Sequence, residues 1–313
     1  MSRYFINIFF IWILVLITYS ITLANMNILT PNLKKHVFLL AKKIGTRNYL
    51  YYKNLEQTCN YINNYFNEYG YNAELQTYNI DNREFHNIIA IKKGDEHSDK
   101  IVVVGAHYDT VTDTPGADDN ASGVAVLLEI SRLFSKMKTD KTIKFIAFVN
   151  EEPPFFRSKL MGSYVASKIA FEKREDIFAM ICLEMVGYFT PVPDSQHYPP
   201  FLSFFYPSCG NFITIVGNIS SGSLVSQLKE KFKKYSDFPV ESISAFKWLP
   251  GIDFSDHLNY WENGYKAVMI TDTAFYRNPN YHKSCDTPET LDYIAMGKIT
   301  ETLFYVLNEM CQK

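Results

Sequence analysis

The chain has 313 residues, and its 31 lysines and arginines against 33 aspartates and glutamates give a formal net charge of −2 at pH 7. Without a basic surplus to neutralise phosphates, nucleic acid is excluded as an expected partner. Five cysteines are too few and too scattered for a disulfide scaffold, and their odd number leaves at least one thiol unpaired or paired between chains.

Residues 1–24 have the pattern of a signal peptide. Arg3 supplies a short positive region, an apolar run covers 5–17, and small residues precede Asn25, where a leader peptidase would cut. The alternative is an uncleaved membrane anchor, because 19–23 could extend the apolar run towards the ~20 residues of a spanning helix. Polar side chains in 19–23 disfavour the anchor. We therefore expect an exported protein, periplasmic or extracellular, with no stable membrane association after cleavage.

Beyond the leader, helical and strand patterns alternate. A helix is predicted over 50–69, followed by an antiparallel pair of strands over 72–80 and 86–93. Short apolar runs typical of parallel strands buried on both faces then lie at 101–106, 142–149, 178–183 and 267–271. Further helices are predicted at 121–134, 161–171, 224–235 and 290–310. The pattern predicts one α/β domain over 25–313, with a mixed, mostly parallel central sheet flanked by helices.

Residues 189–211 interrupt this alternation with five prolines and six Phe or Tyr residues and no clear period. Such a long segment inside a compact domain is often a lid or a wall of a substrate site. A surface excursion packed by its own aromatic side chains is the alternative. We expect an insertion or a lid-like loop here.

Side chains that bind metals follow the carboxyl ends of the predicted buried strands. In chain order they are His107 and Asp109, then Glu151 and Glu152, then Glu184, and finally His282 after a loop. Ligands of open α/β sheets bind at these strand ends, so the side chains are expected at one rim. Two histidines and several carboxylates suit zinc, cobalt or manganese, and the absence of cysteine argues against a closed structural zinc site.

The rim also contains the types of carboxylate that a hydrolytic site with two cations requires. The loop at 116–123 (GADDNASG) supplies a carboxylate that could bridge two ions. Of two adjacent glutamates, one can bind metal while the other accepts a proton from water.

Five segments together resemble the M28 family of zinc aminopeptidases. They are GAHYDT at 105–110, GADDNASG at 116–123, NEE at 150–152, LEMVGYF at 183–189 and YHKSCDT at 281–287. The resemblance extends over roughly 85–312. It implies a zinc exopeptidase-like fold, peptide substrates cleaved at the N-terminal residue, and two Zn²⁺ ions per chain.

The resemblance also implies the role of individual residues. The implied metal ligands are His107, Asp119, Glu152, Glu184 and His282, with Asp119 bridging the two ions. Glu151 corresponds to the general base, Asp109 to a residue that orients His107, and Tyr281 to a residue that stabilises the oxyanion in some members. Glu184 departs from the family, which usually has Asp here, and its longer arm could shift its metal or weaken one site.

Several of these residues have simpler interpretations. Asp118 is expected to cap a turn or a helix rather than bind metal. Ser255 or Asp256 is expected to cap a helix that carries a structural histidine, His257. Cys285 is expected to be a packed or bridged thiol. Tyr281 could equally be an ordinary wall residue.

Two other functions compete with peptide hydrolysis. A glutaminyl cyclase shares this fold and much of the rim but works with one zinc and no hydrolytic water. Its members usually replace the DDNASG pattern, which this chain keeps at 118–123. A non-catalytic binding relative would lose ligands or the base, and none of these residues is missing here.

Overall fold

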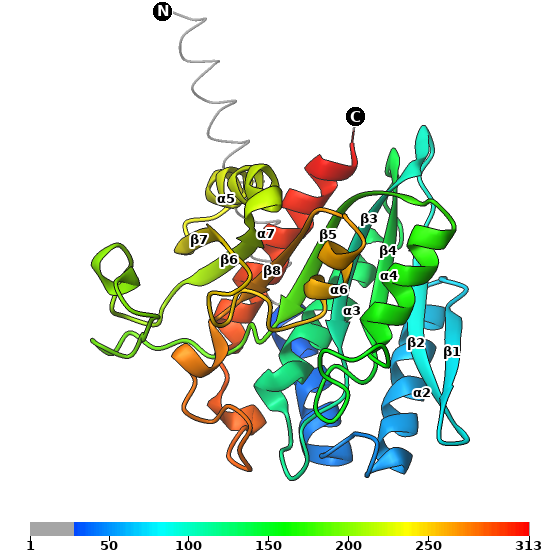
Figure 1. The fold of residues 1–313 in the computed structure, drawn as a ribbon, viewed down its shortest axis with the longest axis horizontal. Helices are drawn as coiled ribbons and strands as arrows, with labels where there is room; N and C mark the ends of the chain where they lie inside the picture. Colours follow the sequence, from blue (N-terminus) through cyan, green and yellow to red (C-terminus); the bar gives the residue numbers. More distant parts are fainter. Residues whose placement is uncertain (1–27, 313) are drawn as a thin grey trace, which may run out of the picture.

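Eight strands form one sheet in the computed structural model, which describes residues 28–312 (Figure 1). The predicted signal peptide lies outside the described residues. Across the sheet the strands follow the order β1-β2-β4-β3-β5-β8-β6-β7. Their bounds are β1 Glu74–Ile80, β2 Arg83–Lys92, β3 His97–His107, β4 Lys141–Phe148, β5 Asp176–Glu184, β6 Ile213–Asn218, β7 Val240–Ala245 and β8 Ala267–Thr271.

The centre of the sheet is parallel and its flanks contain antiparallel pairs. Strands β4, β3, β5 and β8 run in the same direction, and so do β6 and β7. The pairs β1/β2, β2/β4 and β6/β8 are antiparallel. The predicted mixed, mostly parallel sheet is therefore confirmed. Because the four central strands are parallel, their carboxyl ends meet at one edge.

The central strands form because both of their faces are buried. In β3, Val102 and Val104 pack into one hydrophobic core, whereas Ile101 and Val103 pack into a second core on the opposite face. None of the four is more than 7% exposed. Burying each such side chain contributes about 1.5–3 kcal/mol. β-Branched residues also fit the pleated backbone of a strand, so composition and burial favour the same structure.

Helices cover both faces of the sheet (Figure 1). The larger core lies under α2 (Tyr52–Glu68), α3 (Gly123–Phe134), α5 (Gly222–Tyr235) and α7 (Tyr293–Cys311). The smaller core lies under α4 (Gly162–Glu172) and α6 (His257–Glu262). Within 28–312, no helix combines the length and the apolar character needed to cross a membrane.

The sequence did not predict strands β6 and β7, nor a helix at 28–37 that continues into a π-helical segment, Phe38–Ile44. It did predict a helix that carries His257, which is the six-residue helix α6. Strand β7 is at the edge of the sheet and mostly half-exposed, so it lacks a continuous apolar run.

All five cysteines are free thiols. The expectation that Cys285 is packed or bridged is wrong, because its side chain is exposed and forms no disulfide.

Candidate active site

The predicted rim residues meet at the carboxyl edge of the central strands. His107 is the last residue of β3 and Glu184 is the last residue of β5. Glu151 and Glu152 follow the end of β4, and all four side chains are buried. Asp119 lies in the segment Ala117–Ser122, which leads into α3, at a point where the backbone departs from helical geometry. His282 arrives from the loop beyond β8 and is partly exposed.

One oxygen of Asp119 faces a first group of potential ligands. Its Oδ1 lies 3.3 Å from His107 Nε2, and Glu184 Oε2 lies 3.2 Å from the same nitrogen. The ligand atoms of these three residues are all within 4.8 Å of one another. They are close enough to bind a single cation.

The other oxygen of Asp119 faces a second group. Its Oδ2 lies 3.1 Å from His282 Nε2, and Glu152 Oε2 lies 3.5 Å from that nitrogen. These three residues also place their ligand atoms within 4.8 Å of one another. Asp119 therefore belongs to both groups, with a different oxygen in each.

Glu151 lies beside both groups. Its Oε2 is 3.9 Å from His107 Nε2, farther away than the Glu184 carboxylate. One carboxylate oxygen of Glu151 also lies within 4.8 Å of ligand atoms of His107 and Glu152. A carboxylate in this position is close to the cation sites without being needed to complete either of the two groups that share Asp119.

Asp109 holds the backbone that carries the two glutamates. Its Oδ1 accepts a hydrogen bond from the Glu151 amide and its Oδ2 accepts one from the Glu152 amide, both at 3.1 Å. Its Oδ1 also faces His107 Nδ1 at 3.6 Å, longer than a normal hydrogen bond. The sequence pointed to the histidine contact and missed the two amide contacts.

Asp286 holds Asp119 in a similar way. Its carboxylate accepts hydrogen bonds from the amides of Asp118 and Asp119, at 2.9 and 3.1 Å. Asp118 was expected to act as a cap, and this is wrong. Its side chain instead accepts hydrogen bonds from the Gly187 amide and the Asn278 side chain, far along the chain.

The expected cap before α6 is also wrong. Helix α6 begins at His257 without a side-chain capping hydrogen bond from Asp256, and Ser255 Oγ donates to Glu184 Oε2 at 2.7 Å. Ser255 thus fixes the carboxylate whose longer arm departs from the family pattern. His257 is buried and its Nε2 pairs with the Ile252 carbonyl at 2.7 Å, as expected of a structural histidine.

Arg47 shapes the loop between His107 and Asp119. It is fully buried and donates hydrogen bonds to the carbonyls of Tyr108, Pro115 and Gly116 at 2.7, 2.7 and 2.9 Å. Arg47 lies outside every recognisable motif, so no signal in the sequence identified it.

The site concentrates negative charge in a buried place. Burial, followed by the charge of Asp119, raises the pKa of Glu152 to about 8. Burial, together with the neighbouring Glu152 and Glu184 carboxylates, raises the pKa of Glu151 well above its ordinary value. Burial works to raise the pKa of Asp119 as well, but hydrogen bonds from the His107 and His282 rings lower it below the ordinary value.

These carboxylates fit divalent cations. Glu152 Oε1 is buried and has no hydrogen-bond partner within the described residues. Buried carboxylates need positive partners, and two imidazole rings are too few for the acidic side chains gathered here. Bound cations would supply the missing positive charge and favour the ionised carboxylates. The mixture of imidazole nitrogen and carboxylate oxygen suits zinc.

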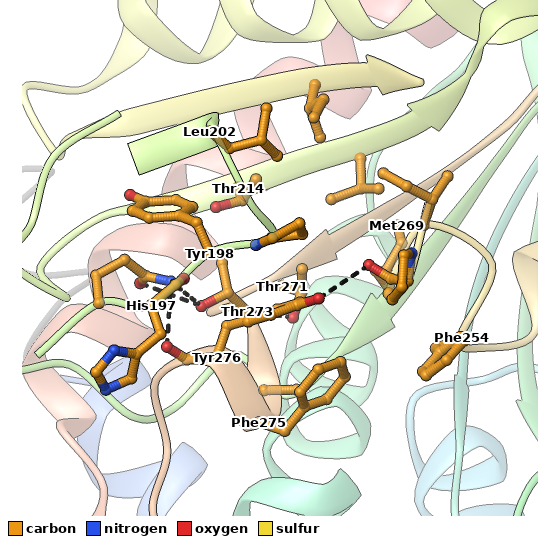
Figure 2. A pocket seen from close by; sticks show the side chains of 18 of the residues that line it. His197, Tyr198, Leu202, Thr214, Phe254, Met269, Thr271, Thr273, Phe275 and Tyr276 are labelled. Atoms are coloured by element: carbon orange, nitrogen blue, oxygen red, sulfur yellow. Dashed lines mark hydrogen bonds between the residues drawn. The ribbon is translucent and has the colours of Figure 1, made fainter. Parts of the chain in front are cut away.

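A cavity of about 100 Å³ adjoins the site, and Glu184 and Tyr281 are among its lining residues. The Tyr281 ring stacks on the His282 ring, with centroids 3.7 Å apart. Figure 2 shows the apolar and aromatic side chains on the other sides of this cavity. A substrate held at the ligand groups could therefore place a side chain in it.

An α/β sheet with histidine and carboxylate side chains gathered at its parallel strand ends has the architecture of a metal-dependent enzyme. Residues 87–307 match the family model of peptidase family M28. The uncharacterized protein YfbL of Escherichia coli (strain K12) is 39% identical in an alignment 284 residues long that covers 88% of this chain and 86% of YfbL. This chain belongs to peptidase family M28.

Two further proteins are similar over shorter or more divergent stretches. Aminopeptidase YwaD of Bacillus subtilis (strain 168) is 48% identical over 117 residues, which are 37% of this chain and 25% of YwaD. The structure of BSAP, a zinc aminopeptidase from Bacillus subtilis, superposes with a TM-score of 0.74 at 16% identity, over 91% of this chain and 95% of BSAP. At that identity the superposition shows a shared fold.

Proposed function

We propose that this protein is a zinc-dependent aminopeptidase that removes the N-terminal residue of peptides, with two zinc ions in one site. The observation that carries the proposal is the position of Asp119, whose two oxygens face two separate ligand groups. Membership of a peptidase family supports peptide substrates. The aminopeptidase names of YwaD and BSAP support cleavage at the amino end.

His107, Glu184 and one oxygen of Asp119 would hold one ion. Glu152, His282 and the other oxygen of Asp119 would hold the second. Zinc bound here supplies a Lewis acid that polarises the scissile carbonyl and lowers the pKa of water. Asp109, Ser255 and Asp286 keep the ligand-bearing segments in place through the hydrogen bonds described above.

Glu151 moves the proton. Its carboxylate accepts a proton from the attacking water as the water oxygen bonds to the peptide carbonyl carbon. It then delivers that proton to the leaving nitrogen as the C–N bond breaks, which yields a free amino acid and a shortened peptide. Burial raises the pKa of Glu151 in the metal-free site, and bound cations would favour its ionised form, which can accept a proton. Burial raises the pKa of the Tyr281 hydroxyl, which therefore stays protonated and can donate to the developing oxyanion.

The competing functions fit the arrangement less well. A glutaminyl cyclase needs one zinc, whereas the described residues form two ligand groups that share Asp119. A binding relative without activity would not need Glu151 beside both groups.

Cleavage of defined peptides tests the proposal. The zinc-loaded protein should remove N-terminal residues from a free peptide and from one with an amidated C-terminus, and it should leave an N-acetylated copy intact. Mass spectrometry of the products measures this directly. Shortening from the carboxyl end would show a carboxypeptidase. Loss of ammonia from an N-terminal glutamine without hydrolysis would show a cyclase.

We further propose that residues 25–313 form one exported peptidase domain after removal of 1–24. The leader-like composition of residues 1–24 supports export. Mature protein isolated from its native host should begin near Asn25. An intact Met1 on soluble protein inside the cell would contradict export.

A further inference from the structure

Three phenylalanine side chains are exposed to solvent on the segment 189–211. Phe201, Phe204 and Phe205 are 76%, 81% and 80% exposed, more than any other large apolar side chain of residues 28–312. In Figure 1 this segment projects from the domain at the side of the sheet where β6 lies. Exposed apolar side chains that gather at one place mark an interaction surface, whereas single ones are common. We call these three residues the aromatic tip.

Hydrogen bonds close the base of the segment that carries the aromatic tip. The Thr190 amide donates to the Gly210 carbonyl at 2.8 Å. Further along, the Gln196 amide donates to the Ser208 carbonyl at 3.0 Å. The two sides of the segment are therefore joined below the aromatic tip, which lies at its far end.

Other contacts attach the segment to the body of the domain. The buried Gln196 side chain donates from its amide to Thr273 Oγ1 at 2.9 Å. The Tyr206 hydroxyl donates to the Ser242 carbonyl of β7 at 2.9 Å, and its ring stacks on the Tyr198 ring with centroids 5.8 Å apart. The aromatic tip is therefore presented from a fixed support.

Packing within the domain does not explain phenylalanine at these positions. In the short helix Leu202–Phe204, the Leu202 side chain lines the cavity beside the proposed catalytic site (Figure 2), whereas Phe204 is exposed. Phe201 has a φ of 71°, a left-handed conformation that is unfavourable for a bulky residue. Its exposed ring gains little from burial in return. A binding role outside the domain would account for all three rings.

The aromatic tip lies in an uncharged stretch of the chain. Residues 195–212 contain no lysine, arginine, aspartate or glutamate. Moving the aromatic tip into an apolar phase would therefore take none of these charged side chains out of water, which is the step that makes most protein surfaces unsuited to a bilayer. Recognition of anionic lipids uses clusters of lysine and arginine near the surface. The charge pattern fits lipid without net charge.

The size of the aromatic tip disfavours a second copy of this chain as its partner. A stable protein interface buries about 800 Å² on each partner. One phenylalanine buries about 150–250 Å², so three rings fall short of that area even at the upper value. A bilayer needs no complementary protein surface, and phenylalanine is among the side chains that enter the boundary between headgroups and acyl chains.

We propose that the aromatic tip docks this protein reversibly on a lipid bilayer with zwitterionic headgroups, with its three rings entering the boundary between headgroups and acyl chains. Such a contact adds a transient association to the expectation of no stable one. It requires no spanning helix, and residues 28–312 contain none. Because Leu202 of the same segment lines the cavity, docking would bring the cavity close to the membrane surface. The proposal does not depend on the proposed aminopeptidase function.

Sedimentation with phosphatidylcholine vesicles tests the proposal. The mature protein, beginning near Asn25, is used because the apolar run at 5–17 would itself enter a bilayer. Phe204→Ser/Phe205→Ser should lower the partition coefficient by more than about 10-fold, since full burial of one phenylalanine contributes about that factor. Binding of the unmodified protein should change little between about 0.1 and 1 M salt, because the aromatic tip carries no charge to be screened.

Leu75→Ser/Phe171→Ser is the matched control. Leu75 and Phe171 are also exposed, on β1 and α4, which lie on the opposite side of the domain in Figure 1. This variant should keep the partition coefficient of the unmodified protein. Phe204→Trp should keep it too, and its added fluorescence should be quenched by vesicles with brominated acyl chains.

Three results would overturn the proposal: no binding of the unmodified protein, an unchanged partition coefficient in Phe204→Ser/Phe205→Ser, or binding that needs anionic lipid and is lost at high salt. A dimer that forms without vesicles and is lost in the same variant would identify a second copy as the partner, and would also overturn it. These measurements involve no substrate, so their outcome is separate from that of the aminopeptidase proposal.

Discussion

Glu151→Gln is expected to lower kcat by about 10²- to 10⁴-fold while the protein keeps its metal and its affinity for substrate-like inhibitors. Glutamine preserves the size of the side chain but cannot take a proton from water. An interaction that is needed mainly in the transition state lowers kcat more than it changes binding. Steady-state kinetics combined with elemental analysis of the same preparation measures both effects.

The neighbouring glutamate provides the matched control. Glu152 contacts His282 and has one buried oxygen that finds no hydrogen-bond partner among residues 28–312, so Glu152→Ala should lower metal affinity, and excess zinc should restore part of the lost activity. If Glu151→Gln loses metal and Glu152→Ala keeps it, the two roles are exchanged. If neither change slows turnover, the active site lies elsewhere.

Asp119→Ala is expected to abolish tight binding of both ions. Even residues that only contact a metal ligand typically cost 10- to 100-fold in metal affinity or activity when replaced. Loss of a carboxylate shared by two ligand groups should therefore lower kcat/KM by more than about 100-fold. Metal content after gel filtration, measured beside kcat/KM, tests this.

His282→Ala is expected to weaken metal binding at one of the two ligand groups and to leave the other group complete. Its ring contacts the Asp119 oxygen on the Glu152 side, and the His107 and Glu184 group is left complete. This variant should retain about one ion while Asp119→Ala retains close to none. Equal metal loss in the two variants would contradict the shared role of Asp119.

The sequence predicted the central strands and the rim because both depend on local patterns. Continuous apolar runs are typical of buried parallel strands, and β3 and β5 end within a residue or so of the predicted limits, at His107 and Glu184. Parallel strands then bring their ends together by geometry alone. Because the strand ends could be predicted and the strands are parallel, His107, Glu152 and Glu184 could be expected at one rim.

The supporting contacts could not be predicted because they join segments far apart in the chain. Ser255 lies 71 positions from Glu184, and Arg47 lies 69 positions from the Gly116 carbonyl that it binds. A serine before an expected helix usually suggests a cap. In this fold the Ser255 hydroxyl donates a hydrogen bond to the buried Glu184 carboxylate instead. The two side chains meet because α6 packs against β5.

The segment at 189–211 shows a second feature that could not be predicted from the sequence, which is its position in the fold. Its prolines and aromatic residues indicate an irregular segment but not its position. The position is set by Gln196, whose contacts with Thr273 and Arg277 carry no local pattern.

Titration of the metal-free protein with zinc tests the central claim most directly. Activity on an N-terminally free peptide, followed against the number of zinc equivalents added, should reach its maximum at about two ions per chain, because Asp119 joins two ligand groups. Full activity with one tightly bound zinc, and no further binding at the second group, would contradict the account.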